Sequence, residues 1–318
     1  MGEVREKIEA SNNNEEAEKE NEKNLAEEPI GEEKMKKESD SGNDIKVDLS
    51  GVNETLLVPL CARAIESKKT SPFFIDHTAV KIVEKIDCDL EKHSKSKMNM
   101  CGCAARTVII DREVKKYIKK NPKCSVVNLG AGLDDRFSRV DNGRIHWYNI
   151  DFENIIELRK QLIPDNRREK EIAMSALDKR WIEEIENKEN VLVIAEGLLM
   201  YLKQEDVVKL FNMITSNFKE CSIICELMTI WLVKNQKVHD TIKNTSARFT
   251  WGITESSDVE KIVPNIELYG DYNITDQMKK MMPVFITLVS PFLRKRNNRI
   301  ACFKKITMRK FDINKFRK

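Results

Sequence analysis

The stretch KCSVVNLGAGLDDRFSRV (residues 123–140) decides the fold that this sequence predicts. It begins with a short apolar run, breaks at Gly130 and Gly132, and then turns acidic. A continuous apolar run of this length is typical of a buried strand in a parallel sheet. Glycine lets the backbone turn tightly and pass close to a ligand, because it carries no Cβ that could collide with one. We therefore interpret the stretch as a strand that ends at a ligand site.

The pattern of an apolar run followed by an amphipathic helix repeats along the chain. Such alternation predicts an α/β fold, with a doubly wound parallel sheet that is covered by helices on both faces. Two later strand-like runs are expected to close the far side of the sheet. The further apolar runs lie at residues 144–151, 169–177 (weaker), 189–197 and 221–228, the helices at 152–163 and 204–218, and the late strands at 265–273 and 298–306.

The residues before this sheet predict a helical N-terminal part, 45–122. Helical periodicity is present there in three segments, and a Lys/Ser-rich loop at 87–102 separates the second from the third. The sheet core and a helical segment after the fifth strand account for 123–307. We therefore interpret 45–307 as one domain. The three helical segments are residues 54–67, 73–86 and 104–120.

The first 44 residues differ in composition from the rest. They hold 15 acidic and 7 basic side chains with little aliphatic periodicity, and such a segment cannot bury enough apolar surface to offset its ordering entropy. We expect a disordered acidic leader over residues 1–44. The remainder carries 37 acidic against 48 basic side chains, a formal net charge near +11 rather than +3. Its basic residues are scattered, apart from a basic tail at 308–318, so no nucleic acid partner is expected.

Targeting and cysteine patterns indicate a cytoplasmic protein. No apolar run reaches the roughly 18 residues that span a bilayer, and the N-terminus lacks a signal-peptide pattern, so no membrane contact is expected. The eight cysteines, several of them inside apolar runs, are expected to be reduced. Cys101 and Cys103, with His93 nearby, lack the second matched pair of a zinc site, so no metal is expected.

An acidic residue supports a nucleoside-bearing ligand at the glycine turn. Asp151 ends the next apolar run, nineteen residues after Gly132, where a carboxylate can accept hydrogen bonds from a ribose diol. A dinucleotide site would need a third glycine and a neutral helix start for its pyrophosphate, whereas this sequence has Asp134 and Asp135. S-adenosylmethionine has no phosphate and carries a sulfonium and an ammonium, so it tolerates both acids. The alternative is that the two aspartates cap the helix.

Two further acids follow predicted strands. Asp178, in SALDKRW, comes after the third strand, where a side chain can meet an adenine edge, and Glu196, in VIAEGLLMYL, ends the fourth. A lone aspartate after a strand is commonly a helix cap. Four consecutive strand ends that each offer a glycine or a carboxylate at the same edge of one sheet favour a shared pocket.

The motifs NLGAGLDDRF, YNIDFENIIELRKQLIP, SALDKRW and IAEGLLMYL together resemble one family over residues 52–305. This is the leucine carboxyl methyltransferase and polyketide-synthesis (tetracenomycin-type) O-methyltransferase family of class I S-adenosylmethionine-dependent enzymes. The resemblance implies a Rossmann-like, mostly parallel sheet with an antiparallel C-terminal edge, and S-adenosylmethionine as cofactor.

The resemblance also implies roles for individual cofactor-binding residues. No catalytic residue is assigned, and Asp135 stands where the family usually has threonine. Gly130 and Gly132 would border the methionyl and ribose parts, Asp151 would hold the ribose, Asp178 would sit at the adenine, Glu196 would lie near the amino acid moiety, and Arg106 matches the arginine that pairs with the methionyl carboxylate.

The predicted function is methyl transfer from S-adenosylmethionine to an oxygen, a carboxylate of a small molecule or of a protein terminus. A carboxylate is ionised at neutral pH and needs no general base, whereas a phenol needs one. Tyr201, His77 and His239 are possible acceptor-side contributors, and none is nominated as catalytic. Trp231, Phe249 and Trp251 follow the fifth strand, where the resemblance implies a helical cap over the acceptor pocket.

Two other hypotheses remain. The chain could be a catalytically weak, methyltransferase-like scaffold whose acidic leader engages a basic partner. It could also be an NAD-dependent oxidoreductase, which the missing third glycine and the Asp134–Asp135 pair disfavour. The oligomeric state cannot be predicted from the sequence.

Overall fold

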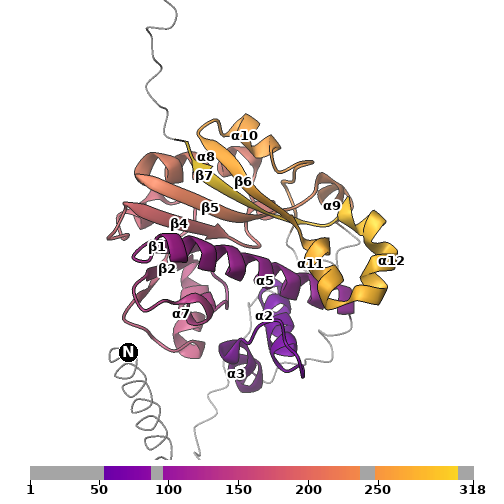
Figure 1. The fold of residues 1–318 in the computed structure, drawn as a ribbon. Helices are drawn as coiled ribbons and strands as arrows, with labels where there is room; N and C mark the ends of the chain where they lie inside the picture. The colour runs from indigo at the N-terminus through magenta and orange to yellow at the C-terminus, as the bar shows by residue number, and fades with distance from the viewer. Residues whose placement is uncertain (1–53, 87–95, 237–247, 307–318) are drawn as a thin grey trace, which may run out of the picture. The chain divides into compact units, whose positions relative to one another are not determined.

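The computed structural model describes residues 54–86, 96–236 and 248–306. Figure 1 shows these residues folded as a twisted sheet with helices packed against it. The predicted leader (1–44), the predicted tail (308–318), His93 and His239 lie outside the described residues.

A seven-stranded sheet in the order β3-β2-β1-β4-β5-β7-β6 forms the centre of the fold. Strands β1 to β5 are parallel, whereas β7 runs antiparallel between β5 and β6. The prediction of a mostly parallel sheet with an antiparallel C-terminal edge is confirmed. The strands are β1 (Ser125–Leu129), β2 (His146–Asp151), β3 (Glu169–Ala173), β4 (Asn190–Ala195), β5 (Glu220–Leu227), β6 (Ile266–Asn273) and β7 (Arg299–Lys305).

The register of the central strands brings their carboxyl ends together. Leu129 of β1 pairs with Ile150 of β2 on one side and with Ala195 of β4 on the other. Gly130, Asp151 and Glu196, the residues that follow, therefore emerge at the same edge. The strand order reverses between β1 and β4, and open α/β sheets bind their ligands at such a switch point.

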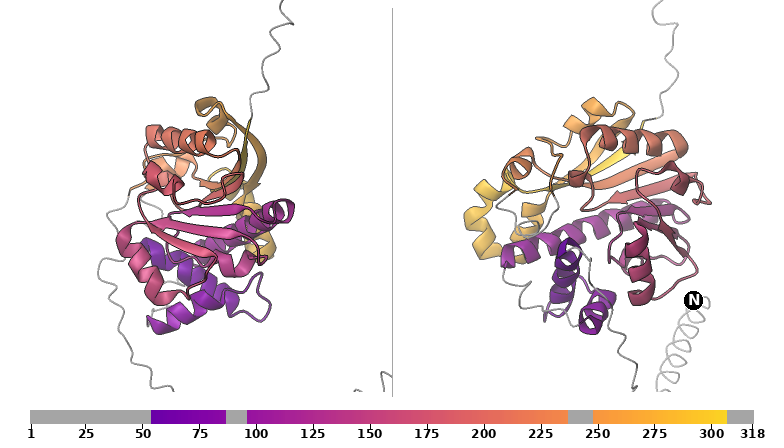
Figure 2. Two further views of the ribbon diagram at one scale, coloured as in Figure 1. Left: turned by 90° about the vertical axis from the view of Figure 1, so that its left-hand side faces the viewer. Right: turned by 180° about the vertical axis from the view of Figure 1, so that it is seen from behind.

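Helices cover both faces of the sheet, so its inner strands are apolar on both sides. Val126 of β1 packs with the long helix α5 (Lys97–Lys120), and its neighbour Val127 packs with α8 (Gln204–Asn217) on the other face. Figure 1 shows α5 in front of the sheet, and the rear view in Figure 2 shows α8 on the opposite side. Below the sheet, α2 (Glu54–Ser67), α3 (His77–Lys85) and α7 (Glu153–Leu162) share a separate apolar cluster.

Helix α5 corrects a predicted boundary. It begins at Lys97, and the Ser96 hydroxyl caps it by accepting a hydrogen bond from the Asn99 N–H at 3.4 Å. The loop predicted over 87–102 is therefore wrong from residue 97 onward. Met100 and Cys101 are buried, and their packing sustains the helix despite Gly102, since tertiary contacts override a weak local propensity.

Shorter elements complete the fold. A short 3₁₀ helix, η1 (Lys179–Ile182), follows β3. The region after β5 begins with α9 (Ile230–Lys234), and residues 237–247 beyond it lie outside the described residues. The sequence did not predict the two helices that connect β6 to β7. The remaining elements are η2 (Leu199–Tyr201), α6 (Arg136–Val140), α10 (Asp258–Ile262) and the connecting pair α11 (Ile274–Met281) and α12 (Pro283–Arg294).

Three general findings concern the described residues alone. None of their helices is both long and apolar enough to cross a membrane. They contain no cluster of three side chains suited to hold a metal ion. Their seven cysteines form no disulfide with one another.

Candidate functional site

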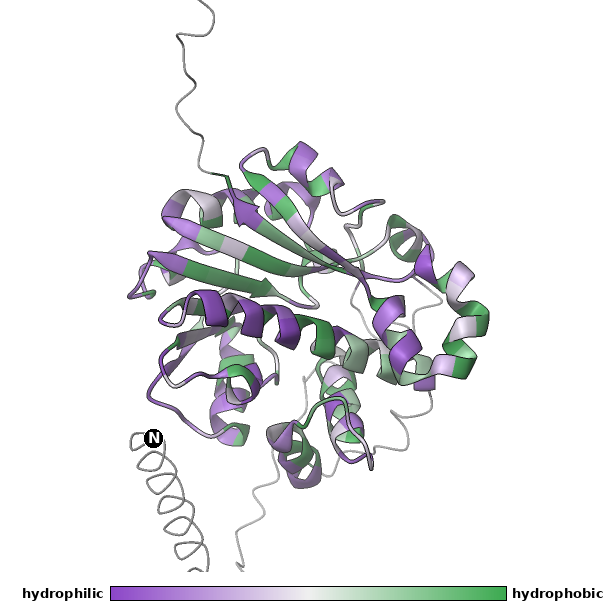
Figure 3. Ribbon diagram, viewed as in Figure 1, coloured by the Kyte–Doolittle hydropathy of each residue, from purple (hydrophilic) through white to green (hydrophobic). Residues whose placement is uncertain are grey.

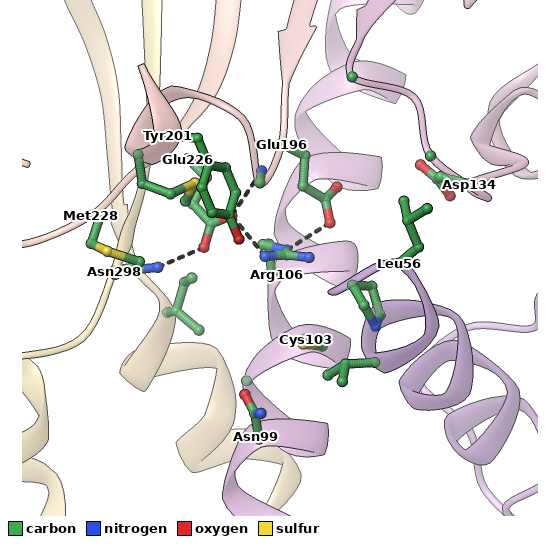
Figure 4. A pocket seen from close by; sticks show the side chains of 18 of the residues that line it. Leu56, Asn99, Cys103, Arg106, Asp134, Glu196, Tyr201, Glu226, Met228 and Asn298 are labelled. Carbon is green, nitrogen blue, oxygen red and sulfur yellow. Dashed lines mark hydrogen bonds and ion pairs between the residues drawn. The ribbon is translucent and has the colours of Figure 1, made fainter. Parts of the chain in front are cut away.

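A pocket opens at the carboxyl ends of β1, β4 and β5 (Figure 4). Its empty volume, with the open space at its mouth included, is about 1100 Å³. One wall consists of the residues that follow β1 and β4, a second of α2 and α5, and a third of residues near the ends of β5 and α12. Of the predicted cofactor residues, Arg106, Gly130, Gly132 and Glu196 line this pocket.

The glycine turn after β1 forms the base of the first wall. Gly130 and Gly132 have φ angles of 65° and 52°, in the left-handed region that side chains other than glycine rarely adopt. A Cβ on Gly132 would also come within 3.0 Å of the Cδ2 atom of Leu56 in α2. Both the backbone conformation and the space therefore require glycine at this turn.

Asp151 lies behind the glycine turn and is not among the residues that line the pocket. Its two carboxylate oxygens accept hydrogen bonds from the Gly132 N–H and the Phe152 N–H, each at 2.8 Å. Burial raises the pKa of Asp151 above its ordinary value, and these two N–H groups oppose the shift. The carboxylate thus fixes the turn, and its predicted contact with a ribose stays a prediction.

Asp178 is not brought to the pocket. It caps η1, where its carboxylate accepts a hydrogen bond from the Arg180 N–H at 3.0 Å and forms an ion pair with the Arg180 guanidinium at 2.5 Å. This short-range pairing lowers the pKa of Asp178 to about 2. The role at the adenine implied by the resemblance stays a prediction.

Arg106 joins the walls of the pocket. It projects from α5 between two carboxylates, with its Nε 2.6 Å from Glu196 at the end of β4 and its Nη1 2.7 Å from Glu226 in β5. Glu226 also accepts hydrogen bonds from the Gly197 N–H at 3.0 Å and from the Asn298 amide at 2.7 Å. Figure 4 shows Arg106 between the two glutamates at the centre of the site.

The ion pairs continue from the pocket into the protein interior. Arg136 contacts Glu196 at 2.6 Å, Asp111 at 2.6 Å and Asp134 at 3.0 Å. Arg139 then contacts Asp111 and Asp134 at 2.8 and 3.0 Å. Together with two N-terminal residues, the connected group holds four guanidiniums and five carboxylates, a net charge of −1. Its members are Arg63, Arg106, Arg136, Arg139, Asp76, Asp111, Asp134, Glu196 and Glu226.

These contacts set the charge state of the site. Burial raises the pKa of Glu196, but the guanidiniums of Arg106 and Arg136 outweigh it and hold the pKa below the ordinary value. The pKa of Asp134 is lowered in the same way, against its burial, by Arg136 and Arg139. Both carboxylates are therefore ionised at neutral pH. A buried charge needs such partners, because desolvation alone would neutralise it.

Asp134 and Asp135 have different roles. Asp135 is the N-cap of α6, where it accepts a hydrogen bond from the Ser138 N–H at 3.4 Å, and the Thr78 hydroxyl donates to it at 2.5 Å. The capping alternative therefore holds for Asp135. Asp134 lines the pocket and belongs to the ion-pair group.

An apolar and sulfur-containing cluster lies in the part of the pocket away from the glycine turn. The rings of Tyr201 and Phe249 lie 5.5 Å apart beside Met200 and Met228. Burial raises the pKa of Tyr201 to about 12 and also raises the pKa of Cys103, so both groups stay protonated at neutral pH. The other candidate residues are elsewhere: Trp251 belongs to the core, Trp231 stacks against Arg296, and His77 begins α3.

Sequence reasoning missed Glu226 as a site residue. It is 2% exposed and sits in the apolar run CSIICELM, where a lone glutamate was the available signal. An acid inside a strand that is buried on both faces needs a partner, but the sequence does not show that the partner is Arg106, 120 residues away. Asn298 was missed because its partner, Glu226, is also distant in the sequence, 72 residues away.

The model of a family described as Leucine carboxyl methyltransferase matches residues 57–215, half of the chain. This chain belongs to the leucine carboxyl methyltransferase family. It is therefore a methyltransferase, and the predicted family and enzyme class are confirmed.

Two curated relatives agree with this assignment. The chain is similar to the tetracenomycin polyketide synthesis O-methyltransferase TcmP of Streptomyces glaucescens, with 27% identity over 229 residues that cover 72% of this chain and 85% of that protein. It is also similar to the S-adenosyl-L-methionine-dependent methyltransferase dpfgK of Gibberella zeae, with 25% identity over 246 residues that cover 70% of this chain and 82% of the relative.

A solved structure supports the fold alone. A DUF574 family protein from Streptomyces avermitilis superimposes with a TM-score of 0.52 at 11% sequence identity. The match covers 78% of this chain and 96% of that protein. The match supports the α/β fold expected from the sequence.

Proposed function

We propose that this S-adenosylmethionine-dependent methyltransferase transfers its methyl group to a carboxylate oxygen of a small molecule or of a protein terminus. The observation that carries the proposal is the set of titratable side chains that line the described pocket. The pocket contains two carboxylates, Glu196 and Glu226, that are already paired with Arg106. It also contains Tyr201 and Cys103, whose pKa values are raised. An acceptor that is already ionised needs no base, and a carboxylate is such an acceptor at neutral pH.

The residues of the pocket fit S-adenosylmethionine. The charged groups of the lining are two arginines and three carboxylates, a net charge of −1, which complements a ligand that carries a sulfonium, an ammonium and a carboxylate. Asn298 Oδ1 is buried in the lining and has no hydrogen-bond donor among the described residues. This oxygen could accept a hydrogen bond from the ammonium of such a ligand.

The protein's contribution is to bind, orient and exclude water. S-adenosylmethionine supplies a methyl group that its sulfonium already activates. The turn at Gly130 and Gly132 would hold the cofactor, and Asp151 stabilises this turn by accepting the Gly132 N–H. The ion pair of Arg106 with Glu196 keeps both groups charged and in place at the end of β4. Alignment of two reactants can supply about 7–11 kcal/mol of a barrier. No further acid or base is needed for a carboxylate acceptor.

The chemistry of the product tests the acceptor class. The full chain is incubated with S-adenosylmethionine that carries a tritiated methyl group and with a panel of carboxylic acids, phenols and carboxyl-terminal peptides. Methyl esters release volatile methanol in mild base, whereas methyl ethers do not. We expect base-labile tritium with a carboxylate; base-stable label on a phenol alone would contradict the proposal.

The same screen addresses the scaffold hypothesis. Tight binding of S-adenosylmethionine by calorimetry, combined with no turnover on any acceptor class, would favour a catalytically weak binding protein. The oxidoreductase hypothesis is wrong, because the chain belongs to a methyltransferase family.

A further inference from the structure

Helix α12 presents an apolar ridge to solvent. Val284, Leu288 and Phe292 are 80%, 75% and 70% exposed, and their spacing of four residues places them on one side of a helix. Phe285, beside them, is 49% exposed. We call these four residues the α12 ridge. Figure 3 shows the hydrophobic bands of α12 at the outer end of the molecule, beyond α11.

The opposite side of the same helix is also apolar. Ile286 is fully buried, and Val289 and Leu293 pack against the core cluster that contains α5. A surface helix is normally apolar on its core-facing side alone, and one that is apolar all round is buried on every side. The α12 ridge therefore lacks a covering surface that its composition requires.

Basic residues flank the ridge on both sides. The stretch KKMMPVFITLVSPFLRKR (residues 279–296) holds five lysines and arginines and no acid. Lys279 and Lys280 end α11, and Arg294, Lys295 and Arg296 follow the ridge, all of them exposed. Asp276 of α11 pairs with Arg294, and Arg296 stacks on Trp231 at 4.6 Å. An apolar segment of about 10–14 residues is short for a spanning helix and long enough for a helix in a membrane interface, and basic groups at its ends add electrostatic attraction to anionic lipids.

We propose that the α12 ridge docks on an anionic lipid surface. Phe, Leu and Val side chains would enter the boundary between headgroups and acyl chains, and the flanking basic groups would contact the lipid phosphates. A second copy of the chain fits the ridge less well, because a symmetric contact would bring the basic flanks of the two copies together. The expectation of no membrane contact rested on the lack of a spanning segment, which a docking helix does not need.

The ridge lies next to the pocket in the chain. Ile274, at the start of α11, and Asn297 and Asn298, just after the basic flank, all line the pocket. The pair α11–α12 thus joins two segments of its wall. The proposal concerns where the enzyme works and goes beyond its methyl-transfer chemistry, so a binding assay can test it without an acceptor.

The test is flotation of the full chain with vesicles of phosphatidylcholine alone or of equal parts phosphatidylcholine and phosphatidylglycerol. We expect binding to the anionic vesicles that weakens as salt is added. The double variant Leu288→Gln/Phe292→Gln should bind at least about tenfold more weakly. Thr287→Gln, an exposed position on the same helix outside the ridge, should bind as the wild type does.

A second variant tests the electrostatic part. Lys279→Gln/Lys280→Gln should lower the affinity for anionic vesicles about fivefold per lysine. Unchanged melting temperature and S-adenosylmethionine affinity show that each variant is folded. The proposal is overturned by a wild type that stays off anionic vesicles at low salt, or by a ridge variant that still binds them as tightly. It is also overturned if the ridge variant merely turns a dimer into a monomer in light scattering, because the face would then belong to a second copy.

Discussion

The guanidinium of Arg106 in α5 lies 2.7 Å from the carboxylate of Glu226 in β5, and this ion pair fastens the long helix to the sheet at the pocket. Glu226 holds two further groups, the Gly197 N–H after β4 and the Asn298 amide before β7. One buried carboxylate therefore connects three segments of the site.

Replacing Glu226 with alanine should destabilise the fold strongly. The variant leaves Arg106 with Glu196 alone and leaves two buried donors without an acceptor, so the free energy of unfolding should fall by about 3 kcal/mol. Urea denaturation measures the change. Glu184→Ala is the control, because its pair with Lys170 at 2.7 Å is exposed and should contribute less than about 1 kcal/mol. An equal decrease in the free energy of unfolding in both variants would show that the buried pair contributes no more to stability than the exposed one.

Gly132→Ala should lower the affinity for S-adenosylmethionine by about tenfold or more. The added Cβ would come within 3.0 Å of Leu56. The alanine would also have to adopt the left-handed φ of 52° that residue 132 has here, so the turn that borders the pocket must shift. Gly143→Ala is the matched control: its φ is 77° and its Cβ would meet nothing within 4 Å. Both variants should lose about 1 kcal/mol of stability, but calorimetric titration should show weaker binding in Gly132→Ala alone.

The sheet could be predicted from the sequence because each inner strand is buried on both faces. Val126 and Val127 face opposite layers and are both fully buried, so the run reads as apolar throughout. The turn after β1 was predictable because only glycine fits it. Helix α12 was missed because its apolar run contains Pro291, and an internal proline argues against a helix interior.

The site could be predicted only in part, since its contacts are made across long sequence distances. Gly130, Gly132 and Glu196 follow strands and were found from that position, whereas Arg106 came from the family resemblance. The sequence around Glu226 does not indicate that its partner is Arg106. Asp178 shows the limit of a local rule, because an acid after a strand can equally cap the turn that follows, as it does here with Arg180.

Asp111→Asn should remove part of the acid sensitivity of the fold. Burial raises the pKa of Asp111, but Arg139 and Arg136 outweigh it and hold the pKa below the ordinary value of 3.8. As the pH falls, the unfolded chain therefore protonates Asp111 before the folded protein does. The stability that the Asp111 carboxylate contributes is fully present above pH 3.8 and is lost as the pH falls from there through the lower pKa of the folded state. Unfolding measured between about pH 5 and pH 2 should show a shallower acid slope in the variant. An unchanged slope would mean that the pair is not ionised in the folded protein.

Glu169→Gln should change the opposite side of the pH profile. Burial raises the pKa of Glu169 from 4.5 to about 7, so between these values the folded protein holds a proton that the unfolded chain has lost. Wild-type stability should therefore rise as the pH falls through this window. The variant should lack this rise and should be more stable than the wild type at mildly alkaline pH. Glu189→Gln, at an exposed pair with Lys219, should leave the profile as it is.

Tyr201→Phe should retain most of the activity on the acceptor that the methanol-release screen identifies. With a pKa raised to about 12, the hydroxyl cannot take a proton at neutral pH, and phenylalanine keeps the ring beside Phe249. Since loss of a general base costs about 10²–10⁴ in rate, a change in kcat/KM below about tenfold excludes that role. A larger fall, together with the loss of a pH-dependent limb of the rate profile, would assign the base to Tyr201 and would argue for a hydroxyl rather than a carboxylate acceptor.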